Sequence, residues 1–149
     1  MTLAGIQAAA AEALRALPWV REHGVAVLAE DEGNVVFDRE AEFAKSHLAA
    51  IVGACSFEPA SRSAHTPQIA GMARLSVRVL EEPSRNRVGQ GRSGPSATEA
   101  AEAIACGMHL CRIGGGVLVS AGIGGMERFD ETTAMRVAAF EIFTELEGK

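Results

Sequence analysis

The glycine-rich run at residues 89–94 has the residue types and spacing of a phosphate-binding loop. Gly89, Gly91 and Gly94 match the G-x-G-x-x-G pattern, in which glycines let a pyrophosphate approach the start of a helix. A dinucleotide fold also needs a strand that leads directly into this loop. The nearest expected strand ends too early, near Leu80, and a proline intervenes before the next helix. The context favours a plain glycine loop, and a small nucleotide- or ligand-binding enzyme stays the alternative hypothesis.

Cysteine and histidine side chains offer a second kind of chemistry. Zinc sites need a tetrahedral ligand set, whereas Cys106 and Cys111 lie five residues apart on one expected helix and point to different sides. A Cys–His nucleophilic pair built on Cys55 is the sharper alternative. Its candidate partners are His47, His65 and His109. Cys55 lies in an apolar run where burial makes a thiol inert, so we interpret the cysteines as buried structural residues.

Two acidic clusters and a second glycine-rich segment complete the set of chemical candidates. Neighbouring carboxylates can do acid–base work or hold Mg²⁺, but adjacent acids on a loop are more often solvated charge. We interpret residues 30–32 and 81–82 in this way. Residues 121–125 follow an expected strand and are predicted to form a turn. We therefore predict no catalytic, cofactor-binding or metal-binding residue, and no enzymatic activity.

Arginines concentrate positive charge on the long polar segment that precedes the best-predicted helix. They are Arg85, Arg87 and Arg92, in a chain whose net charge is −5. Arginines concentrated in this way could contact an acidic surface of another protein, bind a phosphate at the helix N-terminus, or simply be solvated. We predict that these three residues belong to a protein interface.

Length and composition restrict the class of protein. The chain has 149 residues, 48% of them hydrophobic, which suits a single domain over residues 1–149. Its acidic balance argues against nucleic-acid binding and against docking on an anionic membrane. Three cysteines do not form a disulfide framework, and the N-terminal apolar run carries Glu12 and Arg15, unlike a signal peptide. We expect a soluble chain made in a reducing cytosol.

Hydrophobic periodicity predicts an α/β (α+β) fold, a mixed β-sheet flanked by helices in the order α-β-α-β-β-α-β-β. Helices are expected over residues 3–17, 37–48 and 96–111, and strands over residues 25–29, 51–57, 71–80 and 117–120. Ser96 and Glu99 form a capping-box signature at the start of the last helix. Residues 134–146 carry both a strand period and a helix period, so their periodicity does not decide between the two.

The run from Leu75 to Leu110 resembles a known family. An alternating strand ending in V-x-V-x-E is followed by Asn86-Arg87, a glycine-rich spacer and an alanine-rich helix that finishes in His109-Leu110. This arrangement is similar to small tail proteins of tailed bacteriophages and prophages, above all the tail-terminator and tail-completion (minor tail) group. The resemblance covers about three quarters of the chain, and its specific part is residues 77–87.

The resemblance implies a structural subunit that assembles into a homo-oligomeric ring, often a hexamer, at the head-proximal end of the tail. Its implied partners are the tail tube and the head-completion or neck proteins, and its implied location is the virion, after assembly in the host cytoplasm. It brings no catalytic residue, and it favours a strand for residues 134–146. A bacterial protein-interaction module unrelated to phage stays an alternative.

Overall fold

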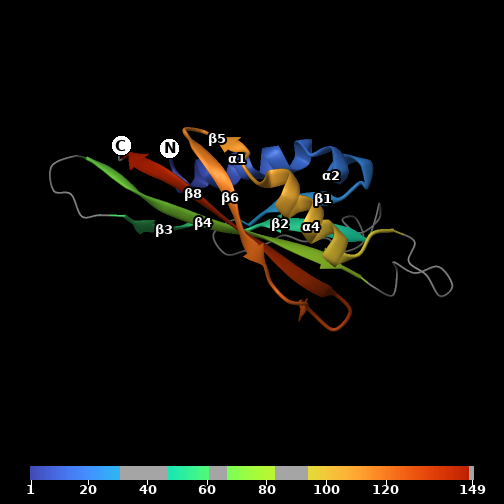
Figure 1. The fold of residues 1–149 in the computed structure, drawn as a ribbon. Helices are drawn as coiled ribbons and strands as arrows, with labels where there is room; N and C mark the ends of the chain where they lie inside the picture. The colour runs from blue at the N-terminus through green and yellow to red at the C-terminus, as the bar shows by residue number, and fades with distance from the viewer. Residues whose placement is uncertain (31–46, 61–66, 83–93, 148–149) are drawn as a thin grey trace.

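The computed structural model describes residues 1–30, 47–60, 67–82 and 94–147. Within them lies one mixed sheet with helices on one of its faces, which confirms the predicted fold class (Figure 1). The predicted helix over residues 37–48 lies mostly outside these ranges, as do residues 89–93 of the glycine loop. No helix among the described residues is long and apolar enough to cross a membrane.

The sheet is built on two long antiparallel strands that pair along their whole length. They are β4 (Gln68–Glu81) and β8 (Ala134–Glu147), whose register runs from Gln68↔Glu147 to Glu81↔Ala134. The other strands are β1 (Ala26–Ala29), β2 (Leu48–Val52), β3 (Ser56–Pro59), β5 (Arg112–Ile113), β6 (Gly116–Ile123) and β7 (Glu127–Arg128). The order is β1-β2-β4-β8-β6-β5, with β3 beside β4 and β7 beside β8, and β1 and β2 form a parallel pair. The strand alternative for residues 134–146 is therefore confirmed.

Helices α1 (Leu3–Ala16), α2 (Pro18–Glu22) and α4 (Ala97–Met108) pack together on one face (Figure 1). The Thr2 hydroxyl caps α1 by accepting the Gly5 N–H at 3.0 Å, and Pro18 ends it as predicted. The Ser96 hydroxyl caps α4 by accepting the Glu99 N–H at 3.1 Å, which confirms the first half of the capping box. The second half differs from the prediction, because the Glu99 carboxylate accepts a hydrogen bond from the Ser96 hydroxyl, at 3.5 Å, and not from the Ser96 backbone N–H.

The core lies between these helices and one face of the sheet. On β4 the inward residues are the odd-numbered ones, and on β8 the even-numbered ones, because side chains alternate along a strand. Fully buried members include Ile6, Leu14, Val77, Val79, Ile104, Met108, Leu118, Phe140 and Ile142. The amphipathic patterns predicted for α1, β4 and α4 therefore point to the observed core.

The predicted strand over residues 51–57 proved to be parts of two strands, β2 and β3, separated by a bulge. Val52 pairs with Val77 and Ser56 with Arg74, so this chain advances four residues while β4 advances three. Between them the Gly53 N–H still donates to the Ser76 carbonyl oxygen, at 2.8 Å. A single extra residue of this kind bends a strand and increases its twist.

Other boundaries differ from the predictions for equally local reasons. Leu48, assigned to a helix, begins β2, where it is fully buried. Helix α4 ends at Met108 rather than near Cys111, because the backbone of His109 is already extended and Leu110 adopts a left-handed backbone with φ 67°. Residues 121–123, predicted as a turn, continue β6. The short elements α2, β3, β5 and β7 fall below the length at which a period can be read.

Two adjacent glycines allow a direct test of how tightly β6 lies against β8. A Cβ on Gly116 would lie 2.7 Å from the Phe143 carbonyl oxygen, whereas a Cβ on Gly115 would meet nothing within 4 Å. We expect Gly116→Ala to lower the free energy of unfolding by about 1–3 kcal/mol, since backbone atoms must shift. Gly115→Ala should leave it unchanged or raise it by up to ~1 kcal/mol. Urea denaturation of both variants checks this, and equal effects would contradict the packing described.

Candidate functional site: the helix-free face of the sheet

The sheet face opposite the helices is buried at one end and exposed at the other. At the β1–β2 end, Ala49, Ile51 and Leu80 form a second small buried cluster. At the other end, over β3, β4, β8, β6 and β5, large apolar side chains reach solvent. Phe143 is 56% exposed, Val119 41% and Val117 38%. A group of exposed apolar residues on one face of a sheet is a candidate interaction surface.

Five residues of this exposed end form one line across the sheet, which we call the Phe143 row. Register pairs Glu58 with Met72 and Met72 with Phe143. Leu118 pairs with Ile142, which places the preceding residue, Val117, beside Phe143, and Val117 pairs with Arg112 on β5. The row is Glu58, Met72, Phe143, Val117 and Arg112. It is apolar in the middle, acidic at the β3 edge and basic at the β5 edge.

A charged row lies next to it, centred on Arg74. The Arg74 guanidinium donates to Glu58 at 2.7 Å and to Glu141 at 3.1 Å, and these bonds raise the pKa of Arg74. Val119, the register partner of Glu141, completes this row. Two carboxylates thus share one arginine, which leaves this part of the face with a net negative charge.

A hollow of about 270 Å³ lies beyond the charged row. Here β6 carries a bulge, since Ser120 pairs with Phe140 and Gly122 with Ala139. Ala139 in turn pairs with Ser76, which the bulge between β2 and β3 flanks from the other side. Both neighbours of the β4–β8 ribbon are therefore irregular at the same level, and only small side chains fill the face there. The hollow is lined by Ala54, Ser56, Arg74, Leu75, Ser76, Ala121, Ala139, Phe140 and Glu141.

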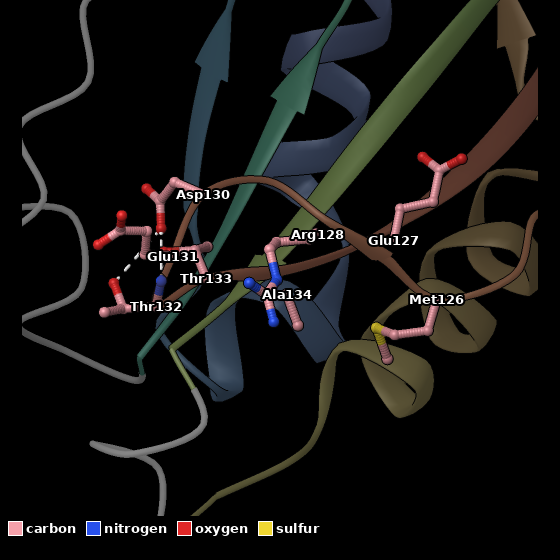
Figure 2. A pocket seen from close by; sticks show the side chains of 8 residues that line it. All are labelled: Met126, Glu127, Arg128, Asp130, Glu131, Thr132, Thr133 and Ala134. Carbon is pink, nitrogen blue, oxygen red and sulfur yellow. Dashed lines mark hydrogen bonds between the residues drawn. The ribbon is translucent and has the colours of Figure 1, made fainter.

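A larger pocket, of about 340 Å³, lies at the β7–β8 hairpin (Figure 2). Asp130 closes the turn by accepting the Thr132 N–H at 2.9 Å. Figure 2 shows Glu127 pointing away from Asp130 and Glu131, so these carboxylates do not converge on one point. No group of three or more His, Cys, Asp or Glu side chains that could hold a metal ion occurs within the described ranges. The hairpin pocket therefore offers a turn rather than a reaction centre.

Among the described residues, the cysteines and histidines form no group that could hold a metal ion. Cys55 is half-buried against the core, and burial raises the pKa of its thiol to about 11, which keeps it protonated and inert as predicted. Cys106 is exposed on α4, so the expectation that it is buried was wrong. The His109 ring has a structural role, because its Nδ1 accepts the Ser120 N–H at 3.0 Å and protects the edge of β6. His65 lies outside the described residues.

Two further predictions are corrected or left outside the described structure. Glu81 and Glu82, interpreted as solvated charge, are buried at 1% and 5% exposure. Glu30 is also largely buried, with Arg78 3.4 Å away. Arg85, Arg87 and Arg92, predicted to form a protein interface, lie outside the described residues.

The Phe143 row was missed by the sequence analysis, although one signal for it existed. If residues 134–146 form a strand, its odd-numbered residues must lie on the face opposite Phe140, and Phe143 is among them. Once a strand is chosen for residues 134–146, the exposed position of Phe143 can therefore be predicted from the sequence. The alignment of Phe143 with Glu58 on β3 and Arg112 on β5 cannot be predicted in this way, because it depends on the register between several strands.

Comparison with known proteins adds a likeness of fold. No family model matches the chain, and no curated protein matches it. A chain from the virion of a native gene transfer agent (GTA) particle is 18% identical to it, with a TM-score of 0.61 over 97% of this chain and 98% of that chain. A second solved structure is 14% identical, with a TM-score of 0.50 over 100% and 99% of the two chains. At these identities the likeness shows a shared fold over the full length.

Proposed function

We propose that this chain is a structural subunit of a phage-like virion that works by assembly and not by catalysis. Its finer role in this proposal is tail terminator or tail completion, as a homo-oligomeric ring at the head-proximal end of the tail. The ring contacts the tail tube on one side and head-completion or neck proteins on the other. The chain is made in the host cytoplasm and ends in the virion.

The observation that carries the proposal is the full-length likeness of fold to a chain of a gene transfer agent virion. The similarity of residues 77–87 to tail-terminator and tail-completion proteins was found without that comparison, and it points to the same class of particle. The exposed end of the helix-free face gives a physical reason for assembly. Phe143, Val117 and Val119 are apolar side chains that gain free energy when a partner covers them.

Ring assembly predicts a concentration-dependent mass in solution. We expect light scattering across a concentration series to show particles well above twice the chain mass of 15.6 kDa, with a hexamer as the reference size. Where the free chain stays small, purified tail tubes should recruit it to their ends, because many subunits of such structures assemble only on a template. Negative-stain electron microscopy of the same samples distinguishes rings from irregular aggregates.

The control variant for this measurement is Glu102→Lys. It changes an exposed charge on α4, which lies on the other side of the sheet from Phe143, Val117 and Val119. It should assemble as the unchanged chain does. A chain that never exceeds a dimer, and that does not bind tail tubes at high concentration, would contradict the terminator role. Attention would then turn to ligand binding at residues 89–94, for which Gly91→Ala is the diagnostic variant.

A further inference from the structure

The Phe143 row has oppositely charged residues at its two ends and apolar residues between them, an arrangement that is complementary to a reversed copy of itself. Phe143 is the third of its five members, with Met72 and Val117 on either side and opposite charges, Glu58 and Arg112, at the two ends. Neighbouring strands lie about 4.8 Å apart, so the two charges are separated by roughly 19 Å within one copy. They are too far apart to pair with each other.

From this row we infer a second contact between copies, a face-to-face pair related by a two-fold axis. An axis parallel to the strands and passing at Phe143 reverses the row of the second copy. It places Phe143 against the partner's Phe143, Met72 against the partner's Val117, and Glu58 against the partner's Arg112. A patch that matches itself in this way is the defining property of an isologous interface. The inference goes beyond the proposed ring, in which copies contact one another head to tail.

The middle of the row supplies the attractive free energy of this pair. Phe143 is 56% exposed and Val117 38% exposed in the single copy, and both would be covered when two sheets pack face to face. An aromatic side chain at the centre of an interface, surrounded by polar residues, is the usual form of an energetic hot spot. The neighbouring Val119, 41% exposed, extends the covered area towards the charged row.

The ends of the row supply the specificity. Arg112 is exposed and makes no ion pair with any described residue, so its charge is available to a partner. Glu58 binds Arg74 through Oε2, but its side chain is 67% exposed, so Oε1 can accept a further bond. Two such Glu58–Arg112 contacts form in one pair, while a parallel arrangement of the rows would bring like charges together. The charges of the Phe143 row thus favour the reversed over the parallel arrangement of two copies.

Charge reversal tests the inference. We expect Arg112→Glu and Glu58→Lys each to raise the dissociation constant of the pair about tenfold or more, because each change acts twice in a two-fold dimer. Mixing the two variants should restore association, since the mixed pair contains one native and one reversed contact. Arg128→Glu is the matched control for Arg112→Glu, because Arg128 is exposed and the charge change is the same. Sedimentation velocity measures all of these constants.

Cross-linking separates the two-fold pair from a head-to-tail contact. In a background with Cys106→Ser and Cys111→Ser, Glu145→Cys should be joined to itself by a short bismaleimide. Glu145 is exposed on β8 two residues from Phe143, so it lies on the same face and on the proposed axis, and facing sheets pack about 10 Å apart. Glu102→Cys in the same background should not be cross-linked. The inference is overturned if Arg112→Glu behaves like Arg128→Glu, or if the cysteine at position 145 does not cross-link between copies. A self-linked dimer without rings supports this inference while contradicting the terminator role, so the two failures are distinguishable.

Discussion

Replacement of Glu81 by alanine is expected to lower the free energy of unfolding by about 2–4 kcal/mol. Glu81 ends β4 with 1% exposure, and its Oε1 accepts the N–H of Ala97, the first residue of α4, at 3.0 Å. This bond satisfies a donor that has no partner within the helix and places an acidic side chain at the positive end of the helix dipole. Alanine removes the acceptor and leaves the donor buried.

Two further variants show whether this bond is the cause. Glu81→Gln keeps an oxygen acceptor without the carboxylate, and we expect it to lose about half as much stability. Glu102→Ala removes an exposed glutamate from the same helix and should change the free energy of unfolding by no more than about 0.5 kcal/mol. Urea denaturation followed by circular dichroism gives the three values. If Glu81→Ala were as stable as Glu102→Ala, the link between β4 and α4 would not depend on this carboxylate.

Glu81 is also a residue whose burial was predicted wrongly from the sequence. Followed by Glu82 and a segment rich in Arg, Gly and Pro, it was interpreted as the start of an exposed loop. Composition describes the average environment of a segment, and a loop-like composition predicted solvent. The residue is buried because a helix that begins sixteen residues later returns its N-terminus to the end of β4. That contact is tertiary, and no local pattern encodes it.

Elements whose two sides differ were predicted well. β4 alternates Leu75, Val77 and Val79 with polar residues, and the structure buries these three and leaves Arg74 exposed. β8 was ambiguous because it is apolar on both faces, one side for the core and the other for the exposed surface. The apolar residues on the outer face of β8 therefore made its period ambiguous, and the same residues form the exposed surface proposed for assembly.

The Phe143 row could not be predicted from the sequence, because none of its residues belongs to a recognisable motif. Glu58 and Arg112 lie more than fifty residues apart and belong to short edge strands, one of them only two residues long. Their relation arises from the bulge that shifts β3 by one residue and from the register of β6 on β8. A shift of one residue in either strand would move the charge to the opposite face.

Phe140 and Phe143 allow the two roles of β8 to be measured separately. Phe140→Ala should lower the free energy of unfolding by about 3–5 kcal/mol, because the side chain is 1% exposed and its loss leaves a cavity in the core between the sheet and the helices. Phe143→Ala removes the same atoms from the same strand on the other face, where the ring is 56% exposed. In the single copy it should cost no more than about 0.5–1 kcal/mol. Urea denaturation at a concentration low enough to keep the chain monomeric isolates these values from assembly.

The order of the two effects should reverse when association is measured instead of folding. Phe143→Ala should fold normally and associate weakly, since it removes the centre of the inferred contact while the core stays intact. Phe140→Ala should lose association only in proportion to the fraction of chains that unfold. If Phe143→Ala destabilised the single copy as strongly as Phe140→Ala, the helix-free face would be part of the core. If it left association unchanged, the exposed end of the sheet would not be the surface through which copies pair.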